Sequence, residues 1–262
     1  MDLGIAGKRA LVLGGNRGIG FGIARALVQE GVNVAIAARD MQRLEQAAAE
    51  LRAEGGGAVA CFSVDLRDPD GLAAFADRVA ESFGAIDILV NNTGGPEYGG
   101  ASNRGSEAWR GSFEEMVMSV IALTDAVLPG MRLRGWGRVL TVVSSGVVQP
   151  LPVLGISNSL RGALLGWSKT LSSEVAAEGV TVNILVPGRI DTERVRLTDE
   201  AVAEREGITA DEAQQRSTSV IPLKRYGSVE EFGAVAAFVA SERASYMTGS
   251  MVRCDGGIIR SV

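Results

Sequence analysis

The sequence predicts an α/β protein, a single domain built on a doubly wound parallel sheet of about seven strands with helices on both faces. Two observations predict this fold class. Short, almost continuously apolar segments recur along the chain of 262 residues, and segments of helical pattern separate them. Strands without polar alternation are typical of a parallel sheet buried on both faces. The 34 glycines gather at the ends of these segments and form no linker, so we expect one domain over residues 1–262.

The first elements repeat one pattern, a buried strand followed by a helix that glycine closes. Residues 9–14 are apolar and end in glycine, and residues 18–30 place apolar side chains at helical spacing. A second strand over 32–38 precedes Asp40, which is predicted to be the N-cap of the next helix, and that helix stops at a run of three glycines. Further strands are predicted at 58–64, 86–91, 138–143 and 180–186.

The last third of the chain departs from this pattern. Residues 192–220 are charged and helical in pattern, with a capping box at 209–212. A second capping box, 228–231, precedes an apolar helix, and a last strand is predicted at 250–254. Ligands of a doubly wound sheet bind beyond the carboxyl ends of its strands. Segment 192–220 is therefore either a helical lid over such a site or a solvated helical excursion.

Composition excludes several classes of site. The chain has no histidine, which excludes Ser-His-Asp and Cys-His catalysis and every histidine-ligated metal site. Its two cysteines, Cys61 and Cys254, cannot form a four-cysteine metal site and fit a reducing compartment. A net charge of −5 without a basic cluster argues against nucleic acid. Because we find no apolar run of spanning length and no signal-peptide pattern, we expect a cytoplasmic protein with a small-molecule substrate, no metal and no membrane contact.

A glycine-rich turn joins the first predicted strand to the first helix. It reads Leu-Gly-Gly-Asn-Arg-Gly-Ile-Gly over residues 13–20. Such a turn presents backbone N–H groups and a helix N-terminus to a pyrophosphate, so it predicts a Rossmann-type dinucleotide site; the alternative is a purely structural turn. The candidate cofactor contacts in the turn are Gly14, Asn16, Arg17, Gly18, Ile19 and Gly20.

The end of the second strand indicates which dinucleotide binds. Arg39 stands where a carboxylate would accept hydrogen bonds from the ribose of NAD. A guanidinium suits the 2′-phosphate of NADP instead, and Arg17 could reach the same phosphate. We therefore expect NADP(H) in preference to NAD(H), unless both arginines only solvate the surface.

These motifs together resemble the short-chain dehydrogenase/reductase family. The turn has the family's Gly-x-x-x-Gly-x-Gly spacing, and segments 91–94, 187–192 and 255–257 match later family motifs, so the resemblance covers essentially the whole chain. It implies a Rossmann fold and NADP(H)-dependent reduction of a small carbonyl compound, including a 3-oxoacyl-like ketone. It also implies further cofactor contacts, from the adenine to the nicotinamide: Asp65, Leu66, Asn91, Thr93, Gly94, Arg161, Pro187, Gly188, Ile190 and Thr192. Asn91 could instead tie adjacent strands together.

The resemblance fails at the catalytic positions. The family uses a Tyr-x-x-x-Lys pair, an upstream serine and an asparagine on the preceding helix, and no tyrosine of this chain has lysine four residues later. Counted from Ser144, the tyrosine position holds Ser157 and the lysine position Arg161, and the asparagine position falls on Met116. Ser144, Ser157 and Arg161 are the catalytic candidates. A serine hydroxyl is a far weaker acid than a phenol, whereas Arg161 can bind the nicotinamide ribose and stabilise developing negative charge.

Three functions remain open. The first is a carbonyl reductase whose proton comes from Tyr98 or from water. The second is a reductase of conjugated C=C bonds, because Ser144, Asn158 and Arg161 could stabilise an enolate without a phenol. The Ser-Asn motif and a later Gly-Ile-Thr stretch resemble a bacilysin-pathway member that reduces a conjugated bond and also lacks the tyrosine. The third is a silent NADP(H)-binding protein.

The same resemblance implies a homodimer or homotetramer that forms through helices around 107–134 and 155–178. Met131, Trp136 and Trp167 would fit such an interface, or the core.

Overall fold

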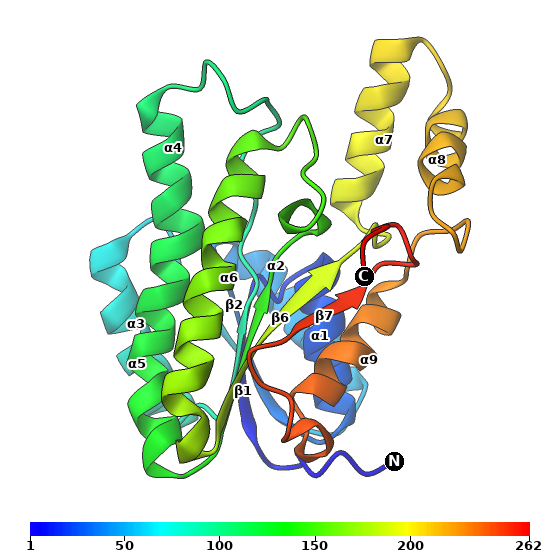
Figure 1. Ribbon diagram of the computed structural model, residues 1–262. Helices are drawn as coiled ribbons and strands as arrows, with labels where there is room; N and C mark the ends of the chain where they lie inside the picture. The colour runs from blue at the N-terminus through cyan, green and yellow to red at the C-terminus, as the bar shows by residue number, and fades with distance from the viewer.

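The computed structural model describes residues 1–262 as a seven-stranded parallel sheet between two layers of helices (Figure 1). The strands are β1 (Arg9–Leu13), β2 (Asn33–Ala38), β3 (Val59–Ser63), β4 (Ile88–Asn91), β5 (Gly137–Val142), β6 (Val180–Pro187) and β7 (Met251–Cys254). The helices are α1 (Gly18–Gln29), α2 (Met41–Ala53), α3 (Pro69–Phe83), α4 (Ser106–Phe113), α5 (Ser119–Leu133), α6 (Gly155–Val175), α7 (Glu193–Glu206), α8 (Ala210–Ser219) and α9 (Val229–Val239). The predicted doubly wound fold is confirmed.

The strand order, β3-β2-β1-β4-β5-β6-β7, reverses direction at β1. The chain builds outward from β1 to β3, crosses back, and then builds outward again from β4, with every neighbouring pair parallel. Such a switch point leaves a crevice beyond the carboxyl ends of the two central strands, here β1 and β4. The topology therefore places a binding site at the end of the first strand.

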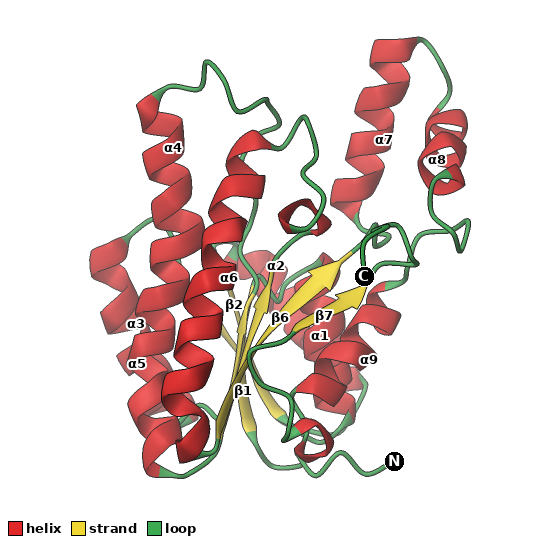
Figure 2. Cartoon of the chain, in the orientation of Figure 1, coloured by secondary structure: helices red, strands yellow, loops and turns green.

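Two apolar clusters hold the layers together, one on each face of the sheet. Helices α1, α2 and α9 pack against one face, and α3, α5 and α6 pack against the other, as Figure 2 shows. Side chains alternate between the faces along β1, because successive strand residues point in opposite directions. Val12 belongs to the first cluster, whereas Leu11 and Leu13 belong to the second. Burial on both faces explains the continuous apolar runs of the sequence.

Side-chain caps start several helices where the sequence predicts them. The Asp40 carboxylate accepts a hydrogen bond from the backbone N–H of Arg43 at 3.1 Å. Both predicted capping boxes form, from Thr209 to Glu212 and from Ser228 to Glu231. Each box satisfies backbone donors that a helix leaves unpaired in its first turn. The residue types at these positions therefore define the starts of α2, α8 and α9.

The helix predicted around 107–134 contains a π-helical segment, Glu114–Met118, between α4 and α5. By length and composition alone, the continuous helix Ser106–Leu133 could cross a membrane. Buried helices of globular proteins meet the same criteria, and one face of this helix packs against the sheet through Leu123 and Met131. The π-helical turn is absent from the sequence prediction. Such turns are frequent at functional sites because they shift side chains around the helix axis.

Of the three residues predicted to lie in an interface or in the core, one is fully buried and two are half-buried. Met131 is fully buried and packs between α5 and the sheet. Trp136 packs partly buried against the first cluster, with Arg138 4.3 Å from its ring centre, and Trp167 packs against the second. The interface alternative is therefore wrong for Met131, because an apolar side chain at that place on α5 faces the sheet.

Candidate functional site

The glycine-rich turn leaves β1 and enters α1 in a conformation that only glycine adopts easily. Gly14 and Gly18 have φ of 62° and 55°, in the left-handed region. A Cβ at Gly20 would lie 2.2 Å from the carbonyl oxygen of Gly14, so the turn and the helix touch backbone to backbone. Thr192 closes the turn from the other side, since its Cγ2 lies 3.4 Å from a Cβ built on Gly18.

The N-terminus of α1 has properties that fit a bound anion. Its N-cap residue, Arg17, makes no side-chain capping bond, and the first turn contains no acidic residue. Helices α2, α3, α8 and α9 start with a side-chain cap, whereas α4, α6 and α7 start without one, as α1 does. The first N–H groups of α1 are therefore left for another acceptor, and the helix dipole favours a negative charge there. The residues present fit the pyrophosphate of a dinucleotide.

Asn92 joins the turn to the strand beside it. Its Nδ2 donates a hydrogen bond to the carbonyl of Leu13 at 3.2 Å and lies 2.7 Å from a Cβ built on Gly14. The preceding residue, Asn91, is fully buried and donates to the hydroxyls of Thr124 (3.2 Å) and Thr141 (3.5 Å). The Asn91 side chain thus ties β4 to α5 and β5, which supports the strand-tying alternative.

Positive charge surrounds the far end of the predicted cofactor site. The Arg39 guanidinium is exposed at the end of β2 and makes no hydrogen bond or ion pair within the chain. Arg17 pairs with Glu193, Nη1 to Oε2 at 2.7 Å, and Arg43 approaches the same carboxylate at 3.8 Å. These contacts leave Arg39 as the cation with no partner at the end of β2.

Asp65 lies beyond the end of β3, where the family resemblance places the adenine. Arg67 binds it through Nη2, 2.7 Å from Oδ2, and through its backbone N–H. These hydrogen bonds hold the pKa of the Asp65 carboxyl at about 2, with a smaller contribution from the charge of Arg39. Asp65 is therefore a carboxylate at every physiological pH. The neighbouring Leu66 packs partly buried on the second cluster.

The strand that carries residues 187–192 ends at the same edge of the sheet. The N–H of Gly188 bonds to the carbonyl of Cys254 at 3.0 Å, which holds β6 beside β7. Ile190 is 3% exposed and packs in the first apolar cluster. Ile19, in the turn, also packs against that cluster. Of the three side chains, that of Thr192 is the one that lies against the glycine turn.

The three catalytic candidates lie at the ends of β5 and α6. Ser144 follows β5, and its Oγ accepts a hydrogen bond from the N–H of Gly146 at 3.2 Å. Ser157 and Arg161 lie one turn apart on α6 and are 6% and 7% exposed. The Ser157 hydroxyl makes no hydrogen bond within the chain. Gly146 lies between Ser144 and Asn158, whose oxygens are 3.5 and 2.2 Å from a Cβ built there.

Arg161 connects the ends of two central strands. Its Nη1 donates to the carbonyl of Val142 at 2.8 Å, and its Nη2 donates to those of Thr93 (3.1 Å) and Gly94 (2.8 Å). A guanidinium has five N–H donors, so two remain for a ligand. Burial, with a smaller contribution from the charge of Arg194, lowers the pKa of Arg161 to about 10. The group stays protonated at neutral pH.

The position that the family fills with asparagine is apolar in this chain. Met116 lies in the π-helical segment, is 1% exposed, and packs with Val143, Ile156 and Leu160. The neighbouring Glu115 turns toward the site instead, with its Oε1 3.5 Å from a Cβ built on Gly94. Because the π-helical turn arises from packing, the sequence contains no signal for the position of Glu115.

Helices α7 and α8 extend beyond the carboxyl ends of β6 and β7 (Figure 1). At the start of α7, Nη2 of Arg194 lies 3.4 Å from the carbonyl oxygen of Pro96. Further along, the hydroxyls of Thr198 and Tyr98 are hydrogen-bonded at 2.6 Å, and buried Asp199 accepts a 2.6 Å bond from Tyr226. The segment thus contacts the loop after β4, and the lid interpretation stays a prediction.

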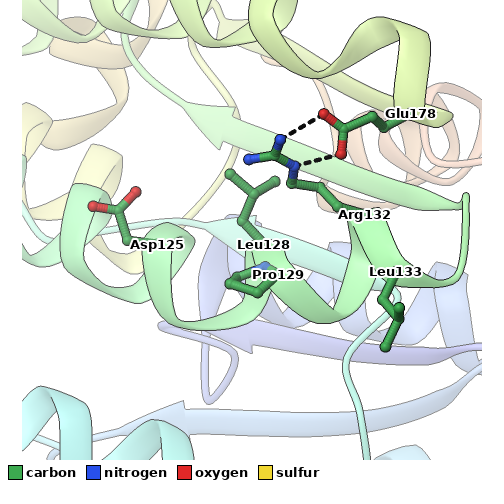
Figure 3. A pocket seen from close by; sticks show the side chains of 6 residues that line it. All are labelled: Asp125, Leu128, Pro129, Arg132, Leu133 and Glu178. Carbon is green, nitrogen blue, oxygen red and sulfur yellow. Dashed lines mark hydrogen bonds and ion pairs between the residues drawn. The ribbon is translucent and has the colours of Figure 1, made fainter.

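A surface hollow on α5 lies apart from these groups. It is lined by Asp125, Leu128, Pro129, Arg132, Leu133 and Glu178 (Figure 3). Arg132 and Glu178 face one another across it in a two-point ion pair. The hollow lies toward the amino ends of the strands, away from the edge where ligands of such sheets bind. We assign the functional site to the carboxyl edge.

Known proteins resemble the chain over nearly its whole length. A family profile described as Enoyl-(Acyl carrier protein) reductase matches residues 14–259. Dehydrogenase/reductase SDR family member 4 of Bos taurus is 37% identical over 254 residues, which is 95% of this chain and 86% of that protein.

Two solved structures resemble the fold closely. L-sorbose reductase from Gluconobacter frateurii, complexed with NADPH and L-sorbose, is 36% identical with a TM-score of 0.95 and full coverage of both chains. YwfH, an NADPH-dependent reductase involved in bacilysin biosynthesis, is 29% identical with a TM-score of 0.92, covering 98% of this chain and 100% of its own.

Proposed function

Because this chain belongs to the short-chain dehydrogenase/reductase family, we propose that it is an NADPH-dependent reductase of conjugated carbonyl compounds, acting on the C=C bond. The glycine turn, the uncapped start of α1 and unpartnered Arg39 fit NADPH, which both solved neighbours are described as using. When bound there, NADPH supplies a hydride. The residues below decide which acceptor the site suits.

One observation favours reduction of the C=C bond over the C=O bond. The site has a buried cation but no acid in the family's usual place. Reduction of a ketone leaves an alkoxide, which needs a proton at once, and the serine hydroxyl at 157 is a far weaker acid than a phenol. Hydride addition to a conjugated C=C bond leaves an enolate, a much weaker base. Hydrogen-bond donors can stabilise an enolate until water protonates it.

The side chains at the ends of β5 and α6 suit the stabilisation of an enolate. Arg161 has two free N–H donors and a charge that no carboxylate neutralises. The hydroxyls of Ser144, after β5, and Ser157, one turn before Arg161 on α6, add neutral donors. Donors held in fixed positions stabilise developing charge more than mobile ones do, because they need no reorganisation during the reaction.

Carbonyl reduction is the second candidate, and the likeness to a sugar-ketone reductase, L-sorbose reductase, favours it. The test is NADPH oxidation with a conjugated enone, followed by identification of the product. A saturated ketone supports the proposal, and an allylic alcohol supports the second candidate. Tight NADPH binding without oxidation of any acceptor would instead support a silent dinucleotide-binding protein.

We expect the variant Tyr98→Phe to keep kcat within about threefold of the wild type. The Tyr98 side chain is 47% exposed and its hydroxyl is bonded to Thr198, so removing it breaks one surface hydrogen bond, worth roughly 0.5–1.5 kcal/mol. The measurement is steady-state enone reduction. A loss of 100-fold or more in kcat would make Tyr98 the proton donor and restore the carbonyl mechanism.

We expect kcat to stay nearly constant from roughly pH 6 to 9 and to fall above about 10. No histidine is present, and the Arg161 guanidinium, with a pKa of about 10, is charged below that pH and loses its proton as the pH rises through it. A pH profile with saturating NADPH and enone measures this. A bell-shaped curve with an inflection near neutrality would contradict a site without an acid in that range.

We expect Arg39→Asp to weaken NADPH binding by about 10- to 100-fold while changing NADH binding less than threefold. The substitution replaces a cation by a carboxylate that repels the 2′-phosphate and can bond to a ribose hydroxyl. Fluorescence titration with both dinucleotides measures the change. Arg52→Gln, on α2, is the control. It also removes an arginine, but Arg52 donates to the carbonyl of Val59 at the start of β3, away from the carboxyl edge of the sheet. Equal weakening of both dinucleotides would contradict the role of Arg39.

We also propose that segment 192–220 is a lid, that the enzyme is a cytoplasmic homodimer or homotetramer, and that the cofactor contacts and catalytic residues are those predicted from the sequence. Small residues on α6 support close approach of a second copy, since a Cβ built on Gly162 or Gly166 has no atom within 4 Å. Sedimentation measures the assembly.

A further inference from the structure

We propose that the acceptor carries a carboxylate, and that Arg194 binds this carboxylate beside the loop that follows β4. The inference rests on the proposed function and names the chemical class of its substrate. Two guanidinium groups contact the loop that follows β4, one from each side. Arg161 binds the carbonyls of Thr93 and Gly94 from inside the molecule, and Arg194 reaches the carbonyl of Pro96 from α7.

Arg194 lies against this loop without a strong partner. Its Nη2 is 2.9 Å from a Cβ built on Gly95, and its guanidinium carbon is 5.6 Å from the ring centre of Tyr98. The bond to Pro96 is long, 3.4 Å, so it engages the guanidinium weakly. Most of its five donors therefore remain for a ligand, in the planar arrangement that matches a carboxylate.

The lack of an acid at Arg194 contrasts with the arginines that lie next to it along the chain. The chain has 31 acidic against 26 basic residues, so carboxylates are in excess. On the same helix Arg196 pairs with Asp191 at 2.9 Å, and just before it Arg189 approaches Asp199 at 4.0 Å. Neither Arg194 nor Arg161 forms an ion pair with any carboxylate of the chain.

Two neighbouring cations without a counter-ion are unfavourable when one of them is buried. The charge of Arg194 reaches Arg161 strongly enough to lower the pKa of the buried group. An anion beside Arg194 would offset this repulsion and would leave the inner guanidinium free to stabilise the enolate. A positive charge such as that of Arg194 selects acidic substrates over neutral ones.

The cofactor does not provide that anion. Its pyrophosphate is assigned to the glycine turn, and the residue of α7 that contacts the turn is Glu193, through Arg17. The contacts of Arg194 are instead with Gly95, Pro96 and Tyr98, all in the loop after β4. The two adjacent residues at the start of α7 therefore serve different sites.

The test compares a conjugated keto acid, 4-oxo-4-phenyl-2-butenoic acid, with its methyl ester, in NADPH oxidation by the wild type and Arg194→Gln. We expect the wild type to prefer the acid in kcat/KM by at least about tenfold. Arg194→Gln should remove this preference by raising KM for the acid, with kcat/KM for the ester and the Kd of NADPH unchanged. Arg196→Gln, on the same helix, should keep the preference.

A second measurement tests carboxylate binding independently of which bond is reduced. Calorimetry of the NADP⁺-loaded protein with the saturated acid, 4-oxo-4-phenylbutanoic acid, and with its methyl ester measures recognition without turnover. Tighter binding of the acid that Arg194→Gln abolishes supports the carboxylate site, whichever bond is reduced. Equal binding of acid and ester by the wild type, or an equal loss of both in Arg194→Gln, would overturn it.

Discussion

Gly20→Ala is expected to weaken NADPH binding by at least about 100-fold. A Cβ there would meet the Gly14 carbonyl oxygen at 2.2 Å and its carbon at 2.7 Å. The obstacle cannot move aside easily, because the N–H of Gly14 bonds to the carbonyl of Ala37 at 2.7 Å and the side chain of Asn92 fills the other side. The turn must therefore open, which moves the N–H groups of α1 away from the pyrophosphate.

Fluorescence titration with NADPH measures the loss, and circular dichroism reports whether the fold survives. Gly111→Ala is the matched control, since a Cβ there meets no atom within 4 Å and alanine favours the helix. We expect the control to bind NADPH within about twofold of the wild type. A folded Gly20→Ala protein with unchanged affinity would refute the assignment of this turn to the cofactor.

Arg161→Met is expected to lower kcat/KM for an enone by about 100- to 1,000-fold. The substitution removes the buried guanidinium beside Ser157 and Ser144, and three carbonyls lose their donor. Arg161→Lys keeps the charge with fewer donors, so we expect it to lose only about tenfold. The opposite order of the two variants would contradict a role for the charge.

Two further measurements separate chemistry from folding in the Arg161 variants. Removing a buried charge without a counter-ion relieves a desolvation cost, which offsets part of the lost hydrogen bonding. We therefore expect the melting temperature of Arg161→Met to change by only a few degrees. NADPH titration shows whether the cofactor still binds. A variant that folds, binds NADPH and keeps a third of the activity would exclude Arg161 from the reaction.

Periodicity and capping residues were sufficient to predict the elements of the fold. Every strand lies within a few residues of its predicted range, because strands buried on both faces need continuous apolar segments. Asp40, Thr209 and Ser228 mark helix starts by a local bond between a side chain and a backbone N–H three residues on. The π-helical turn has no such local signal, since it depends on how α5 packs against the sheet and α6.

The site was predictable only where spacing along the chain defines it. Counting from Ser144 placed Ser157 and Arg161, because both lie on one helix at the period of one turn. The sequence did not indicate that Arg161 would bind a loop 67 residues earlier, nor that Arg194 would contact that loop from the other side. Such partners depend on which strand ends meet, and strand order is a property of the whole fold.

Helix α7 begins with two charged residues of opposite sign, and each contacts a different binding region. Glu193 holds Arg17 of the glycine turn, while Arg194 lies over the loop after β4. A dinucleotide whose phosphates attract Arg17 would compete with Glu193 for this arginine. Loss of the Arg17–Glu193 pair would then affect the position of the adjacent Arg194. We therefore expect cofactor and acceptor to be energetically linked through this helix end, and thermodynamic reciprocity requires each to change the affinity for the other by the same factor. Steady-state kinetics should show this linkage as interdependent Michaelis constants for NADPH and acceptor.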